Sequence, residues 1–168
     1  MSETPDCWEV LADKMIGWMD PNNAPHDLTA IAVNYRSVAE YLQKSLPPTH
    51  ERQVALRKLL ESYTWAMRIG TGFCPTRESK VSEVNAINFW ISEFPDADIP
   101  RVIARKFWHV NDSICLRFRD KVGENTFEHV QAARLLLESR DAAVRACLDM
   151  LAEQQKQEWI KFTRRSMN

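Results

Sequence analysis

The chain has 168 residues, of which 45% are hydrophobic and 27% are charged, and its formal net charge is −1. This length and composition fit a globular protein with one core or two small packed lobes. A net charge near zero gives no reason to expect a nucleic-acid polymer or an anionic membrane as a partner. No stretch approaches the roughly 20 apolar residues that a membrane span needs, so we expect a soluble protein.

The cysteines and the N-terminal charge indicate a compartment. No two cysteines form a CxxC pair, which argues against disulfides and structural zinc. They are Cys7, Cys74, Cys115 and Cys147. Residues 1–27 carry six carboxylates and one lysine, whereas secretory and mitochondrial leaders are basic. We therefore expect a cytoplasmic protein that uses neither a metal nor a cofactor.

The first expected element is a helix that begins after Thr4, a suitable N-cap, with Pro5 at its first position. Its apolar positions recur at helical spacing. They are Trp8, Leu11, Ala12, Met15 and Met19. The sequence DPNNAP at residues 20–25 ends the helix in a loop. We expect this helix to cover the hairpin that follows.

A helical hairpin is predicted over residues 28–70, because two apolar stripes of helical period flank a proline turn. The first stripe comprises Leu28, Ile31, Ala32, Tyr35, Val38, Ala39 and Leu42. The second comprises Leu56, Leu59, Leu60, Tyr63 and Met67. Pro47 and Pro48 cannot continue a helix, Thr49 is a suitable N-cap for the second arm, and Gly70 is a suitable stop. So short a connection predicts antiparallel packing of the arms.

The next segment is predicted to be a linker over residues 71–79, where Gly72 and Pro75 interrupt any periodicity. A helix is then expected from near Ser79, ending before a loop at residues 95–100. Its apolar stripe comprises Val81, Val84, Ile87 and Ile91. Extra aromatic residues widen this stripe, which indicates burial on two sides.

Two further helices are expected, joined by a turn at Gly123. The stripe of the first comprises Ile103, Phe107, Val110, Ile114 and Phe118. The second is long, because no glycine or proline interrupts residues 126–168. Its later stripe comprises Leu148, Leu151, Gln155, Trp159 and Phe162. A helix of this length often supplies an oligomer interface, and the alternative is a frayed tail.

The chain also resembles itself at an offset of 77 residues. Eight of the fourteen positions in residues 55–68 are identical at that offset, without a gap. The alternative is that two amphipathic helices share good helix formers. We predict an all-α fold of two tandem antiparallel hairpins, with additional packing helices and a long C-terminal helix. Residues 1–72 and 79–168 would be its two parts, within one compact unit.

Catalytic signatures are weak. His26-Asp27 is the doublet that HD-type phosphohydrolases use for a metal, but no histidine precedes it. The same doublet fits a loop residue beside an N-cap aspartate. His50, His109 and His129 form no metal-ligand spacing, and there is no P-loop, dinucleotide fingerprint or elbow serine. We therefore predict no enzyme and no catalytic residue, and keep the HD-type hydrolase as a minor alternative.

Cationic and hydroxyl side chains gather instead around the hairpin. They are Tyr35, Arg36, Thr49, His50, Arg52, Arg57 and Lys58. Guanidinium groups and a helix N-terminus favour phosphate oxygens, and a tyrosine ring stacks on bases. We predict a ligand-binding site for a nucleotide-derived anion here. The alternative is an ordinary solvated helix surface.

The hairpin carries a family resemblance. With its LPPTHERQVAL turn and KLLESYTWA second arm, it resembles the helical-hairpin domain of phage proteins that sequester cyclic nucleotide immune signals and so counter the CBASS and Thoeris defences of bacteria. The chain departs from that pattern at His50, Arg52 and Arg57, where the family has arginine, lysine and threonine. The resemblance covers about 37 residues, or roughly 75 if the second copy counts.

The resemblance implies an oligomeric anti-CBASS or anti-Thoeris sponge that binds a nucleotide signal without cleaving it. Such a protein would be a homo-oligomer in the bacterial host cytoplasm if phage-encoded, with no cofactor, membrane or nucleic-acid polymer as partner. A different class also fits the sequence. It is a helical interaction protein with no small ligand, in which the hairpin cations are surface residues and Trp159 and Phe162 contact a partner.

Overall fold

The structure is a computed structural model that describes residues 5–68, 98–121 and 127–166. All elements in these ranges are helices, which confirms the all-α prediction. They are α1 (Pro5–Trp18), η1 (Pro21–Asn23), η2 (His26–Leu28), α2 (Thr29–Ser45), α3 (His50–Arg68), α5 (Asp98–Lys121) and α6 (Phe127–Ser166). Within those ranges, no helix has both the length and the apolar character that crossing a membrane requires.

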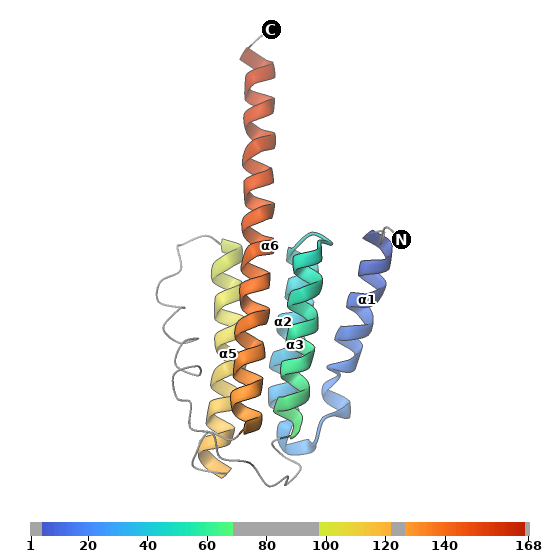
Figure 1. Ribbon diagram of the computed structural model, residues 1–168, viewed down its shortest axis with the longest axis vertical. Coiled ribbons are helices and arrows are strands. Elements are labelled where there is room, and N and C mark those ends of the chain that lie inside the picture. The colour runs from blue at the N-terminus through green and yellow to red at the C-terminus, as the bar shows by residue number, and fades with distance from the viewer. Residues whose placement is uncertain (1–4, 69–97, 122–126, 167–168) are drawn as a thin grey trace.

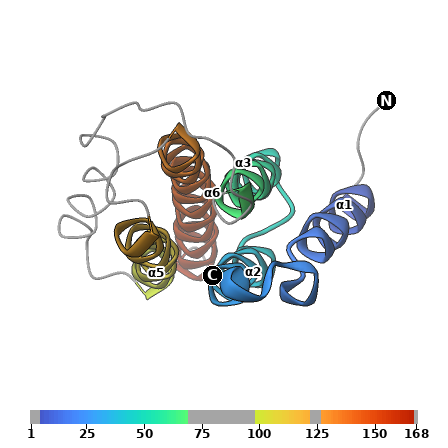
Figure 2. The same ribbon diagram turned by 90° about the horizontal axis from the view of Figure 1, so that it is seen from below.

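Four of the helices form a bundle. Seen along the bundle, α2, α3, α6 and α5 surround a common core, and α1 lies outside against α2 and α3 (Figure 2). Seen from the side, each helix runs antiparallel to its neighbours in the bundle (Figure 1). The most extensive interhelix contact joins α3 to α6. The helix predicted from Ser79, its preceding linker and the turn at Gly123 lie outside the described residues.

Helix α1 is placed by one apolar stripe. Ala12, Met15, Ile16 and Met19 are buried, at the i, i+3, i+4 and i+7 spacing of a single helix face. The prediction for Leu11 is wrong, because this side chain points away from the bundle and is exposed. The helix ends as expected before the DPNNAP loop, where a carboxylate oxygen of Asp20 accepts a hydrogen bond from the amide of Asn22 at 3.0 Å.

Helices α2 and α3 form the predicted antiparallel hairpin. Every apolar residue of the predicted α2 stripe is buried. Helix α2 ends at Ser45, before the two prolines, and α3 begins at His50. The side chain of Thr49 accepts a hydrogen bond from the amide of Arg52 at 3.3 Å, the N-cap contact expected of it. In α3, Leu56, Leu59 and Tyr63 are buried.

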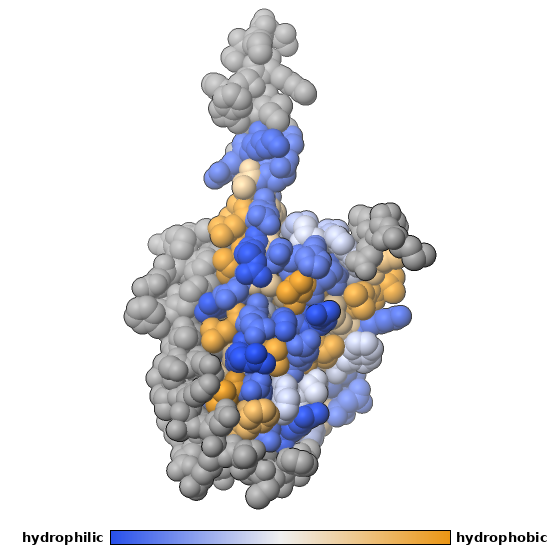
Figure 3. Space-filling model, viewed as in Figure 1, coloured by the Kyte–Doolittle hydropathy of each residue, from blue (hydrophilic) through white to orange (hydrophobic). Residues whose placement is uncertain are grey.

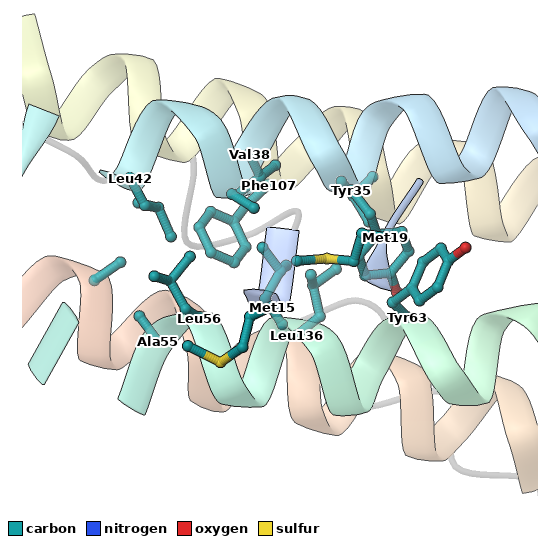
Figure 4. Packing of buried hydrophobic residues seen from close by; sticks show 14 of the residues in the cluster. Met15, Met19, Tyr35, Val38, Leu42, Ala55, Leu56, Tyr63, Phe107 and Leu136 are labelled. Atoms are coloured by element: carbon teal, nitrogen blue, oxygen red, sulfur yellow. The ribbon is translucent and has the colours of Figure 1, made fainter. Parts of the chain in front are cut away.

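One continuous core joins all the helices. Figure 4 shows Met15 and Met19 of α1 beside Tyr35, Leu56 and Tyr63 of the hairpin. From the other side of the bundle, Phe107 of α5 and Leu136 of α6 enter the same cluster, and both are fully buried. Since burial of a large apolar side chain contributes about 1.5–3 kcal/mol, this cluster supplies most of the stabilisation that positions the helix surfaces.

Helices α3 and α6 are joined by two reciprocal hydrogen bonds. The Ser62 hydroxyl donates to the carbonyl oxygen of Ala132 at 2.6 Å, and the Ser139 hydroxyl donates to that of Ala55 at 2.7 Å. All four residues are buried. Both the serines and the alanines are 77 residues apart, the offset of the sequence repeat. Such an exchange is what a two-fold relation between helix pairs requires, while the superposition of the pairs stays a prediction.

Helix α6 is the longest element and leaves the bundle. It spans 40 residues, close to the predicted 126–168. In Figure 1 its C-terminal part extends well past the ends of α2, α3 and α5. The last buried residues of α6 are Ala146 and Cys147, and positions 152–157 are all exposed.

Candidate ligand-binding site on the helical hairpin

Arg52, one of the predicted binding residues, lies inside the protein. Its side chain is 1% exposed. The guanidinium donates to the carbonyl oxygens of Leu46 at 3.0 Å and Gln43 at 3.2 Å, at the end of α2. It also pairs with a carboxylate oxygen of Glu9 in α1 at 2.7 Å. Arg52 therefore caps the C-terminus of α2 and attaches α1 to the hairpin.

The surroundings of Arg52 reinforce this attachment. The Gln43 side-chain amide donates to the Glu9 carboxylate at 3.2 Å and to the Asp13 carboxylate at 2.7 Å. The Gln53 side-chain amide donates to the carbonyl oxygen of Trp8 at 2.7 Å. These contacts form a polar seam between α1 and the turn of the hairpin.

Tyr35 is also buried, with no exposed surface. Its hydroxyl lies 2.7 Å from that of Ser62, and its ring packs edge-on against Tyr63 at 5.6 Å between centroids. Burial raises the pKa of the Tyr35 phenol far above its ordinary value, and the hydrogen bond with Ser62 offsets only part of that effect. Tyr35 and Ser62, whose own hydroxyl reaches Ala132 of α6, form a polar connection across the core.

Arg36 remains at the surface, on α2. It pairs with Glu40 one turn later at 2.8 Å and with Asp20 at 3.5 Å. The hydrogen bond from Glu40 raises the pKa of the guanidinium, against a smaller opposing effect of desolvation. Its side chain is 35% exposed. Among the described residues, no contact joins Arg36 to the cations of α3, so it belongs to a separate group.

The remaining predicted residues share α3. His50 and Arg57 are exposed and lie seven residues apart, about two helical turns. Lys58, next to Arg57, reaches across to Glu138 of α6 at 2.9 Å and along its own helix to Glu61 at 3.4 Å. The hydrogen bond with Glu138 is the main cause that raises the pKa of the Lys58 ammonium. Thr49 is partly buried and serves as the N-cap.

Cations of α6, absent from the predicted set, join those of α3. Arg134 pairs with Glu138 at 3.5 Å, and Arg145 pairs with Glu51 of α3 at 2.9 Å. The repeat offset would have indicated both, since Arg134 corresponds to Arg57 and Arg145 to Arg68. We call this surface the α3–α6 ion-pair face. It comprises Glu51, Arg57, Lys58, Glu61, Arg134, Glu138 and Arg145.

The α3–α6 ion-pair face is a largely hydrophilic stripe along the two helices (Figure 3). It carries four cations and three carboxylates, so it is almost neutral. Arg57 is its most exposed member, at 72% of the side chain, and its contact with Glu61 is the loosest of the set at 3.6 Å. Solvent-exposed ion pairs of this kind contribute only about 0–1 kcal/mol each, so the carboxylates bind these cations weakly.

The histidines and cysteines form no metal centre in the part of the chain that the structure describes, where no group of three or more potential ligands occurs. His26 and Asp27 of the HD doublet lie exposed in η2. His129 is buried, with its Nε2 atom 3.7 Å from the Cys115 sulfur. Burial lowers the pKa of His129 to about 4 and raises that of Cys115 to about 11, so both groups are neutral near pH 7.

Comparison of the chain with known protein families, with curated proteins and with solved structures found no match.

Proposed function

We propose that this protein is a non-catalytic binding protein that sequesters a nucleotide-derived signal, such as a cyclic nucleotide, on the surface of its helical hairpin. The observation that carries the proposal is that the segment resembling the anti-CBASS and anti-Thoeris proteins folds as an antiparallel helix pair, α2 and α3. That segment also keeps Arg57, Lys58 and His50 at the surface.

The chemistry of the α3–α6 ion-pair face favours a phosphate ligand. Arginine forms two parallel hydrogen bonds to phosphate, and such charge-assisted bonds are stronger than neutral ones. A nucleotide phosphate would replace Glu61 at Arg57 and Glu138 at Arg134. The exchange costs little, because exposed ion pairs contribute at most about 1 kcal/mol. Tyr35 and Arg52 are left out of the proposed site, since both are engaged inside the bundle.

Calorimetric titration with cyclic dinucleotides, cyclic trinucleotides and cyclic ADP-ribose isomers tests the proposal. A lost charge-assisted phosphate bond costs about 1.5–3 kcal/mol, so Arg57→Ala and Arg134→Ala should each weaken the bound ligand roughly 10- to 150-fold. Arg105→Ala, an exposed cation on α5, is the matched control and should bind as the wild type does. Failure of the whole panel to bind would refute the sequestration hypothesis.

The fate of the ligand separates binding from catalysis. The protein is incubated with a ligand from the panel and heated to unfold it, and the released compound is analysed by chromatography. Recovery of intact ligand supports sequestration, whereas recovery of a cleaved product supports the hydrolase alternative.

A second candidate is a helical interaction protein without a small ligand. It is favoured by the outward side of α1, where Val10, Leu11 and Trp18 are exposed and Trp18 reaches 62%. Large apolar side chains grouped on one surface commonly mark contacts with other proteins. If no member of the panel binds, this candidate replaces the first.

A further inference from the structure

The end of α6 is a helix without support from the rest of its own chain. Beyond Leu151, fifteen further residues continue the helix to Ser166, a length of about 22 Å. Every position from 152 to 157 is exposed, and Figure 1 shows no other element beside this part. Isolated helices of about 12–15 residues are only marginally stable in water. A second helix lying along this segment would stabilise it.

The sequence of the projecting segment has the spacing of a coiled coil. Its seam positions follow one another at intervals of 4, 3, 4 and 3 residues, the pattern that keeps one face toward a partner helix. They are Leu148, Ala152, Gln155, Trp159 and Phe162. The first of them, Leu148, is already 54% exposed where α6 leaves the bundle. Three of the five positions carry large apolar residues.

The charges of the segment identify the partner and its direction. Residues 149–158 carry three carboxylates and one lysine, a net charge of −2, whereas residues 159–166 carry three basic residues and no acid, a net charge of +3. In an antiparallel pair of identical segments, each basic half lies beside the acidic half of the other chain. A parallel pair would place like charges together, which is unfavourable.

We propose that residues 148–166 pair antiparallel with the same segment of a second copy of this chain, about a two-fold axis at Gln155. In this register position 148 faces 162, and position 152 faces 159, which sets a leucine against a phenylalanine and an alanine against a tryptophan. Gln155 meets its own copy at the centre, and a polar residue at a seam position fixes the register of a coiled coil. The contact is closed by its symmetry, so the assembly is a dimer with one bundle at each end.

Charge-reversal variants of the full chain test this dimer by light scattering over a concentration series at low salt. The wild type should reach twice the chain mass of 19.5 kDa. Arg164→Glu with Arg165→Glu, and separately Glu153→Lys with Glu158→Lys, should each weaken dimerisation at least 10-fold. Combining all four changes reverses both halves and should restore the dimer. A wild type that stays monomeric, or a combination that stays as weak as the two parents, overturns the proposal.

The matched control changes the same amount of charge elsewhere. Lys14→Glu with Lys44→Glu alters two exposed lysines of α1 and α2 and should leave the dimer as strong as in the wild type. Equal weakening by this control would show a general effect of net charge and would overturn the assigned interface.

Cysteine cross-linking tests the direction of the pair, in a chain with Cys7→Ser and Cys74→Ser. Gln155→Cys should give a disulfide-linked dimer under mild oxidation. Leu148→Cys should give none, because the two copies of position 148 would lie about 21 Å apart, whereas a disulfide requires Cα atoms within about 7 Å. Efficient cross-linking of Leu148→Cys would indicate a parallel pair and refute the antiparallel assignment.

Discussion

Replacing Arg52 by alanine should destabilise the protein, because this buried guanidinium joins three parts of the chain. The change removes the hydrogen bonds to the carbonyl oxygens of Leu46 and Gln43 and the ion pair with Glu9. Helix α2 would lose its C-terminal cap, and α1 would lose its central contact with the hairpin.

The size of the effect follows from the exposure of each partner. Hydrogen bonds that involve a charged group contribute about 1.5–3 kcal/mol each. The ion pair with Glu9 is discounted to at most about 1 kcal/mol, because that carboxylate is 43% exposed and regains water when Arg52 is absent. Water entering the vacated space also recovers part of the carbonyl bonding. We expect Arg52→Ala to lower the free energy of unfolding by about 3 kcal/mol.

Urea unfolding followed by far-ultraviolet circular dichroism measures this change. Arg57→Ala is the control, since its side chain is mostly solvated and should shift the free energy of unfolding by less than about 0.5 kcal/mol. Hydrogen exchange should accelerate in α1 of the Arg52→Ala protein, because fewer contacts hold that helix. A loss of stability below 1 kcal/mol, together with weaker nucleotide binding, would refute the structural role and return Arg52 to the ligand site.

Three further predictions follow from buried or half-buried groups. Trp65 is only half-buried, contacting Phe127 edge-on at 5.4 Å, so Trp65→Ala should cost about 2 kcal/mol in urea unfolding; a cost of 4 kcal/mol would mean that it belongs to the core. The pKa of His129 is about 4 in the folded protein and 6.5 when unfolded, so the unfolded state binds more protons between these values. Stability should therefore fall by roughly 3 kcal/mol as the pH drops from 6.5 to 4, and an unchanged slope in His129→Gln would refute this assignment. Ser139→Ala should cost about 1 kcal/mol, but Ser62→Ala about 2–3 kcal/mol because it also deprives the Tyr35 hydroxyl of its partner; equal costs would contradict the connection.

The helices were predictable because their apolar residues repeat at the helical period. Every predicted stripe residue of α2, from Leu28 to Leu42, is buried, and the prolines place the turn directly. The repeat offset also pairs Ser62 with Ser139, the two residues that exchange hydrogen bonds between α3 and α6. Local spacing therefore contained both the elements and one of their main contacts.

The environment of each polar side chain was less predictable. A charged residue is expected at the surface, and the burial of Arg52 depends on Glu9, 43 residues earlier, folding back over the hairpin turn. Tyr35 fits both a core stripe and a stacking site, and only the position of Ser62 opposite its hydroxyl decides between them. Leu11 matched the helical period of α1 but lies on the edge that faces solvent, because Ile16 completes the buried stripe instead.

The dominant contact between α3 and α6 also affects the order in which the nascent chain folds. The 58 residues between Arg68 and Phe127 take about 3–12 s to synthesise at roughly 5–20 residues per second, and α6 itself must then follow. Throughout this interval the hairpin exposes Leu56, Leu59 and the Ser62 hydroxyl, which α6 later covers. Chaperones and neighbouring nascent chains compete with α6 for that side of the hairpin, so the yield of folded protein depends on how quickly the ribosome delivers the second half.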